Sequence, residues 1–124
     1  MESDFSHQII GAAIEVHREL GPGLLEAAYE ECLAYEMPLR ALHFERQKGI
    51  PVRYKKVYVD CGFRLDFLVE NSIVVELKAV DALLPVHQAQ IMTYLKLAQC
   101  SLGLLINFNA SRLTNGLKRV IWTP

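Results

Sequence analysis

The sequence lacks the features of a secreted or membrane-spanning protein. Its three cysteines are an odd number without CxxC or cysteine-histidine spacing, so we predict reduced thiols and neither disulfides nor a zinc site. Charged residues interrupt every apolar run well before the roughly 18 residues that a spanning helix needs. Residues 1–4 contain no basic region and lead into no apolar signal segment. We therefore expect a cytoplasmic protein without a membrane partner.

Linkers, low-complexity segments and internal repeats are also absent. Hydrophobic residues make up 52% of the chain and charged residues 22%, which is a globular composition. A chain of 124 residues buries enough surface to fold without disulfides or structural metal ions, so we expect one domain over residues 1–124. The formal net charge of -1 argues against a uniformly basic protein that coats nucleic acid, but it is compatible with a local basic patch.

Hydrophobic periodicity predicts three helices. Apolar residues recur every three or four positions over residues 5–20, and Gly21-Pro22-Gly23 ends that pattern. A second helical pattern restarts near Gly23 and ends around Pro38. A third helix is expected from Pro85, which suits a first helical turn, to residue 98.

Apolar and polar residues alternate in the remaining segments, which predicts strands. Residues 43–58 suggest one broken strand or two short ones, and residues 63–69 and 73–79 form a hairpin around a turn at 70–72. A buried strand over 102–107 follows the third helix, and a short strand over 119–122 is possible. The resulting order, α-α-β-β-β-α-β, predicts an α/β fold with a mixed central sheet flanked by helices.

One apolar, β-branched run, residues 73–80, contains an acid and a base two positions apart. Side chains alternate along a strand, so Glu76 and Lys78 project from the same face. A strand this apolar is typically buried on both faces, where unpaired charge is costly. A metal ion or a substrate phosphate would explain the charges, whereas the plain alternative is a solvated face of an edge strand.

A further isolated acid, Asp66, lies in the first strand of the predicted hairpin. Alternation places Phe63, Leu65 and Phe67 on one face and Asp66 on the other. In simple register Asp66 lies across from Glu76, close enough for the two carboxylates to hold one cation. Lys78 would then point toward a phosphate oxygen or an attacking water.

Two predicted helices carry further candidate residues. Glu26 and Tyr29 share one helix face, as do Gln90 and Tyr94. For Glu26 the plain alternative is a surface carboxylate, which the helix dipole favours in the first turn. For Gln90 and Tyr94 it is a polar flank of the helix. For His17, a histidine hydrogen bonded to backbone is preferred to a metal ligand.

The order of these motifs resembles that of a known family. The segment Gly23-Leu-Leu-Glu26-Ala-Ala-Tyr29 fits a GxxExxY pattern and precedes Arg64-Leu-Asp66-Phe and Glu76-Leu-Lys78. The chain resembles the GxxExxY proteins of the PD-(D/E)XK nuclease superfamily, and the similarity runs from residues 9–13 to residues 105–108.

The resemblance implies a restriction-endonuclease-like core in which Glu26, Asp66, Glu76 and Lys78 meet at one divalent-cation site. It also implies roles for Gln90 and Tyr94, which match a glutamine and a following tyrosine on the helix after the Glu-x-Lys strand. Asp66, Glu76 and Glu26 would hold Mg²⁺ or Mn²⁺, Glu26 directly or through water. Leu65 stands where the namesake motif has proline, a variable position.

The sequence therefore predicts a small divalent-metal-dependent nuclease that hydrolyses phosphodiester bonds in DNA or RNA. The alternatives are a catalytically silent nucleic-acid-binding or regulatory module on the same fold, which needs a partner protein or a second copy, and a hydrolase of another phosphoester. Tyr54, Tyr58 and Trp122 are candidates for stacking on bases, although packing is the plainer explanation. Candidate phosphate contacts are Arg46, Lys48, Arg53, Lys55, Lys56, Arg112, Lys118 and Arg119.

Overall fold

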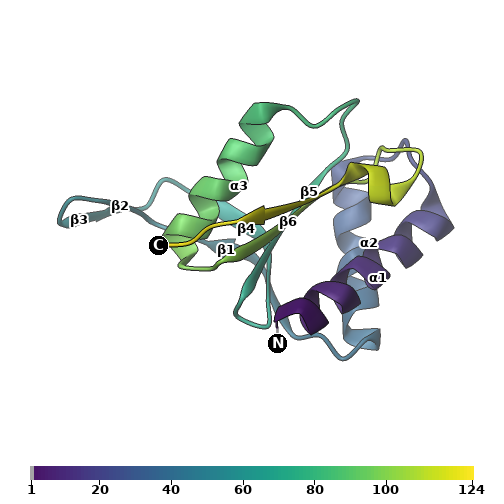
Figure 1. Ribbon diagram of the computed structural model, residues 1–124, viewed down its shortest axis with the longest axis horizontal. Coiled ribbons are helices and arrows are strands. Elements are labelled where there is room, and N and C mark those ends of the chain that lie inside the picture. Colours follow the sequence, from purple (N-terminus) through teal and green to yellow (C-terminus); the bar gives the residue numbers. More distant parts are fainter. Residues whose placement is uncertain (1) are drawn as a thin grey trace.

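A computed structural model describes residues 2–124 and places a five-stranded sheet between α3 on one side and α1 with α2 on the other (Figure 1). The mixed α/β class is as predicted. In chain order the elements are α1 (Glu2–Leu20), α2 (Glu26–Leu39), β1 (Phe44–Gly49), β2 (Val52–Tyr54), β3 (Val57–Val59), β4 (Arg64–Val69), β5 (Ile73–Lys78), α3 (Pro85–Ala98), β6 (Leu102–Asn107), the 3₁₀ helix η1 (Leu113–Gly116) and β7 (Leu117–Ile121).

The sheet has the strand order β1-β4-β5-β6-β7. Neighbours are antiparallel except β5 and β6, which run parallel and are joined by α3 as the crossover helix. Strand β5 is thus the central strand, and its residues from Ile73 to Leu77 are all buried. The alternative that Glu76 and Lys78 lie on an edge strand is therefore wrong.

Two apolar cores lie on the two faces of the sheet. The core on the α1 and α2 side includes Phe67, Val75 and Leu77, and the core on the α3 side includes Val74 and Leu105. Helix α3 approaches β6 closely at Gly103, where a Cβ would lie 2.9 Å from Cδ1 of Ile91. The absence of a side chain there sets the distance of α3 from the sheet. Among residues 2–124, none of the helices combines the length and apolar character needed to cross a bilayer.

The predicted hairpin of β4 and β5 is confirmed, and its turn is tight. Val69 pairs with Ile73, and the N–H of Ser72 donates to the carbonyl of Val69 at 3.0 Å. Glu70 and Asn71 both have positive φ, at 51° and 53°. This is the backbone sign pattern of a type I′ turn, whose twist matches that of the flanking strands and fixes their register.

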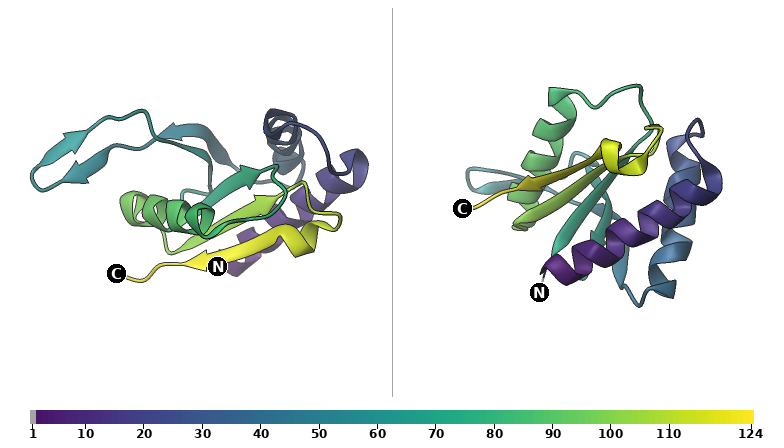
Figure 2. Two further views of the ribbon diagram at one scale, coloured as in Figure 1. Left: turned by 90° about the horizontal axis from the view of Figure 1, so that it is seen from above. Right: turned by 45° about the vertical axis from the view of Figure 1, so that its right-hand side comes forward.

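The segment 43–58 forms three strands rather than the one or two predicted. Strand β1 ends at Gly49, and Pro51, which has no N–H to donate, separates it from β2. Strands β2 and β3 form a two-stranded sheet of their own, a hairpin that extends away from the body of the molecule (Figure 2). Its turn, Lys55-Lys56, lacks the glycine or asparagine that usually marks a two-residue turn, so residue types alone do not predict it.

Candidate active site

Strands β4 and β5 separate at the end where the predicted acids lie. Their ladder stops at the pair Phe67 and Val75. One step further, the N–H of Asp66 donates to Oε2 of Glu76 at 2.7 Å, and the N–H of Leu77 donates to Oδ2 of Asp66 at 2.8 Å. The two carboxylates replace the missing ladder bonds, and Asp66 lies across from Glu76 as the register predicted.

The separation coincides with a bend in β4 and in its other neighbour, β1. Leu65 packs in the core beneath α3, whereas Phe67 packs in the core beneath α1 and α2. The prediction that Leu65 and Phe67 share a face is therefore wrong. The alternation of side chains along β4 is broken at Asp66, so Leu65 and Phe67 point to opposite faces of the sheet. Opposite this point Gln47 has a φ of 52°, which is uncommon for a residue other than glycine and typical of a bend or a functional site.

Glu76 is buried and Asp66 is half-buried, so the charge of this pair is poorly solvated. Glu76 is 6% exposed, and burial first, then repulsion from Asp66, raises its pKa to about 8. Burial also raises the pKa of Asp66, with a further contribution from Glu30, while Lys78 acts in the opposite direction on both acids. A cation beside the pair would relieve the same repulsion.

Glu26 is the first residue of α2, and the loop before it is fixed by the other residues of the GxxExxY motif. Gly23 has a φ of 101°, and its N–H donates to Oδ1 of Asn109 at 3.0 Å. The hydroxyl of Tyr29 donates to the carbonyl of Gly21 at 2.6 Å and accepts from the N–H of Leu24 at 3.1 Å. Tyr29 thus anchors the loop and does not reach the acids.

The carboxyl of Glu26 belongs to the same charged cluster. Although the residue as a whole is exposed, partial burial of its carboxyl raises its pKa, with Lys78 lowering it and Asp66 raising it further. Glu26, Asp66, Glu76 and Lys78 are therefore within electrostatic range of one another.

Helix α3 contributes Tyr94 and Gln90 to the same region. Tyr94 is 7% exposed, and Gln90, one helical turn before it, lines the same cavity. Burial raises the pKa of Tyr94, and the charges of Glu76 and Asp66 raise it further. The tyrosine hydroxyl thus lies near the acid pair, and Gln90 is placed beside the tyrosine.

Two residues that sequence reasoning missed connect α2 to the acid pair. The side-chain amide of Gln47 donates to Oε1 of Glu30 at 2.8 Å and, more weakly, to Oδ1 of Asp66 at 3.4 Å. Glu30 also accepts from Nε of Arg46 at 2.7 Å. Glu30 follows Glu26 by one helical turn, a spacing that would have identified it, whereas the sequence around Gln47 carries no such signal.

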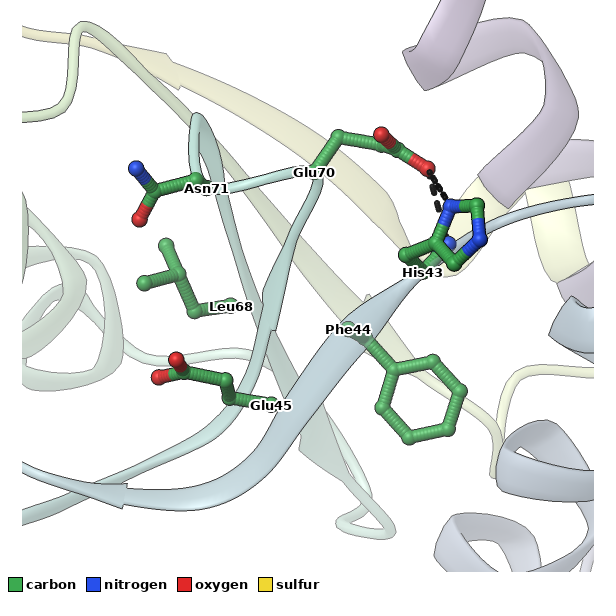
Figure 3. A pocket seen from close by; sticks show the side chains of 6 residues that line it. All are labelled: His43, Phe44, Glu45, Leu68, Glu70 and Asn71. Carbon is green, nitrogen blue, oxygen red and sulfur yellow. Dashed lines mark hydrogen bonds and ion pairs between the residues drawn. The ribbon is translucent and has the colours of Figure 1, made fainter.

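The histidines lie outside this cluster. His17 contacts the carbonyl of Ala110 at 2.8 Å, which confirms the preferred backbone partner, and Nδ1 of His87 accepts from the N–H of Leu84 at the start of α3. His43 and Glu70 face one another beside a cavity of about 360 Å³ (Figure 3). None of the predicted site residues lines that cavity.

The carboxylate oxygens of Asp66 and Glu76 suit a hard cation, but in the described part of the chain only these two acids are placed to bind it directly. Among residues 2–124, no group of three acidic, histidine or cysteine side chains is arranged to hold a metal ion. Asp66 and Glu76 each use one carboxylate oxygen in the bonds between β4 and β5, so each has a second oxygen for a cation. Mg²⁺ typically takes one or two carboxylates and keeps several waters, so the pair fits such an ion while a three-acid cage is not formed.

The fold and the acid cluster define a class of α/β protein with a restriction-endonuclease-like core. A family model described as the PD-(D/E)XK nuclease superfamily matches residues 3–120, and the chain belongs to that superfamily. Neither a curated protein nor a solved structure was found to match the chain. Superfamily membership supports a nuclease-type function and the use of divalent metals such as Mg²⁺.

Proposed function

We propose that this protein is a divalent-metal-dependent nuclease, organised as one nuclease-like domain over residues 1–124, that hydrolyses phosphodiester bonds in nucleic acid. The observation that carries the proposal is the carboxylate pair of buried Glu76 and half-buried Asp66 in the opening between β4 and β5. The two backbone N–H groups that these acids accept need only an uncharged side-chain oxygen, so the raised pKa values of two acids beside a lysine point to a further role for the charges. We also propose that the chain is one of the GxxExxY proteins within the superfamily, which the motif from Gly23 to Tyr29 around Glu26 supports.

In this proposal Asp66 and Glu76 hold Mg²⁺ or Mn²⁺ and Glu26 reaches the ion through water. The bound ion would lower the pKa of a coordinated water and neutralise charge on the phosphate. Lys78, on the same face as Glu76, orients the attacking water or stabilises charge that develops on the phosphate oxygens. Gln90 positions water or a phosphate oxygen, and the buried Tyr94 lies beside it in the same cavity.

Ion pairing narrows the set of basic residues that contact phosphate. Arg46 is engaged by Glu30 and Glu31, at 2.7 Å and 2.6 Å, and Lys48 is paired with Glu45 at 2.8 Å. These two cations are already partnered by acids, so they are weaker candidates than the lysines and arginines outside such pairs.

The competing proposal is a catalytically silent module that binds nucleic acid or regulates a partner. The intact set Glu26, Asp66, Glu76 and Lys78 favours the nuclease. A hydrolase of another phosphoester would use the same residues and differs only in its substrate.

The test is incubation of the purified protein with single-stranded, double-stranded and branched DNA and RNA in Mg²⁺ or Mn²⁺. We expect cleavage that disappears in EDTA and falls at least 100-fold in Asp66→Asn and in Lys78→Met. Glu19→Gln on α1 and Lys96→Met on α3 are matched controls, since both residues are exposed and lie outside the cluster and outside the candidate phosphate contacts. Unchanged cleavage in Asp66→Asn and Lys78→Met would overturn the assignment, and metal binding without any cleavage would support the silent module.

A further inference from the structure

The β2–β3 hairpin, residues 52–59, is an exposed arm that the proposed active site does not use. It forms a sheet separate from the central one and extends from the body of the molecule (Figure 2). From Arg53 to Val59 every residue of the arm is exposed. An isolated two-stranded hairpin is only marginally stable in water, so a free arm of this kind gains order from what it binds.

The arm carries three cations, no acid and two large exposed aromatic rings. Tyr54 is 60% exposed and Tyr58 is 69% exposed. Nζ of Lys55 lies 5.3 Å from the ring centre of Tyr54, and Cζ of Arg53 lies 5.9 Å from the ring centre of Tyr58. Rings beside cations form the combination that binds unpaired bases by stacking and their phosphates by charge.

The two tyrosines lie on opposite faces of the arm. Arg53 pairs with Tyr58 and Tyr54 pairs with Val57, and neighbouring positions along a strand alternate between faces. Each face therefore presents one ring with a cation over it. This arrangement suits a flexible single strand that wraps the arm better than it suits the rigid surface of a duplex.

The turn of the arm places a lysine where glycine is easier to accommodate. Lys55 has a φ of 53°, whereas Lys56 does not have positive φ, which is the sign pattern of a type II′ turn. Glycine is preferred at that first position because it has no Cβ. The arm thus accepts an unfavourable backbone conformation at its tip and carries two positive charges there.

The base of the arm adjoins the proposed active site. Val52 at its start and Phe63 just after its end line a cavity of about 240 Å³ together with Gln90 and Tyr94 of α3. The ring centres of Phe63 and Tyr94 are 6.4 Å apart. A strand held by the arm would therefore continue into the region of the acid pair.

We propose that the arm binds single-stranded nucleic acid and directs it to the site of Asp66 and Glu76. Delivery of the strand to Asp66 and Glu76 rests on the proposed nuclease function, whereas binding of the strand by the arm does not depend on catalysis. The competing occupant is a second copy of this chain, since α1 and α2 present a groove lined by Glu15, Glu19, Glu31 and Glu36 that is complementary in charge to the arm.

The test is fluorescence anisotropy with labelled single-stranded and duplex oligonucleotides of one sequence, in EDTA so that no metal or cleavage is needed. We expect tighter binding of the single strand, reduced about tenfold by Tyr54→Ala and again by Tyr58→Ala. Tyr35→Ala is the matched control, because Tyr35 is 73% exposed and lies on α2. Circular dichroism melts verify that each variant remains folded.

A second variant separates binding from folding. Lys55→Gly relieves the positive φ, so we expect unchanged or greater thermal stability together with weaker binding. The salt dependence of binding should decrease, with the slope of log K against log salt falling by about 0.7 for the lost lysine. Lys96→Ala, at an exposed lysine of α3 that is not a candidate phosphate contact, serves as the charge control.

Three outcomes of the binding and light-scattering experiments would overturn the inference: equal binding of single strand and duplex, equal losses in Tyr54→Ala and Tyr35→Ala, or arm-dependent dimers without any binding of oligonucleotide. Failure of the nuclease proposal gives a different pattern, in which arm-dependent binding persists in EDTA and no metal-dependent cleavage occurs. Cleavage that is unaffected by the arm variants would leave the nuclease proposal standing and overturn this one.

Discussion

Asp66 and Glu76 each stabilise the strand that carries the other. The carboxylate of Glu76 accepts the N–H of Asp66, and the carboxylate of Asp66 accepts the N–H of Leu77, the residue after Glu76. Removing either side chain would leave an unpaired N–H at a gap in the sheet. Amide substitutions, which keep an oxygen acceptor, are therefore the right probes of charge at this site.

Metal binding should depend on the acid pair. In isothermal titration calorimetry with Mn²⁺ we expect one site in the unmodified protein and at least tenfold weaker binding in Asp66→Asn and in Glu76→Gln, because each loses a charged oxygen ligand. Glu26→Gln should weaken binding less, since its contact is through water. Glu45→Gln, at an exposed residue on β1, is the control. Equal affinity in all four variants would contradict the proposed site.

Stability of the metal-free protein should fall as the pH rises. The pKa of Glu76 is about 8 when folded against an ordinary value of 4.5, so between these values the folded protein holds a proton that the unfolded chain releases. The contribution of Glu76 to the free energy of unfolding is therefore greatest at and below pH 4.5. It declines as the pH rises from 4.5 to about 8. The loss is of the order of a few kcal/mol.

Denaturant titrations of the metal-free protein at several pH values would measure this decline. Asp66, Lys78 and Glu26 face Glu76 and contribute to its titration. Glu76→Gln should flatten the decline, and Mg²⁺ should stabilise the unmodified protein more at pH 8 than at pH 5, because the ion competes with protons. A decline of equal slope in Glu76→Gln would show that another group is responsible.

The loop before Glu26 should depend on the hydroxyl of Tyr29. Tyr29→Phe removes the group that bonds both the carbonyl of Gly21 and the N–H of Leu24, and we expect a loss of about 1–2 kcal/mol in the free energy of unfolding. Tyr35→Phe, at an exposed residue of the same helix, should change stability by less than about 0.5 kcal/mol. Equal effects of the two substitutions would mean that the loop does not need this anchor.

The amide of Gln47 should position Asp66. Gln47→Asn keeps a residue that tolerates positive φ but shortens the side chain by one methylene, so the bridge from Glu30 to Asp66 is lost. We expect a stability change within about 0.5 kcal/mol and a several-fold loss of Mn²⁺ affinity. Calorimetry beside a thermal melt measures both quantities, and unchanged affinity would remove Gln47 from the site.

Those parts of the candidate site that depend on local interactions could be predicted from the sequence. Glu76, Lys78 and Asp66 are linked by one hairpin, so strand alternation and a tight turn are enough to place them. The mixed α/β class also followed from hydrophobic periodicity and element order. The superfamily match over residues 3–120 agrees with the motifs that identified it from the sequence.

The bend at Asp66 and the arm could not be predicted, because both depend on departures from local preference. Alternation assumes a regular strand, whereas β4 turns over where Gln47 of β1 has positive φ. The arm has a turn of two lysines in place of the usual glycine or asparagine, so alternation predicts only one broken strand or two short ones over residues 43–58. The contact of Gln47 with Asp66 joins β1 to β4 and is visible only in three dimensions.

The turn at Glu70 and Asn71 makes the acid pair sensitive to chain length. Side chains alternate along a strand, so inserting or deleting one residue between Val69 and Ile73 would shift β5 by one position against β4. An apolar residue would then stand opposite Asp66, and Glu76 would face the core of α1 and α2. Related chains that keep all four charged residues but differ by one residue in this turn are therefore expected to have lost the site, whatever their overall similarity.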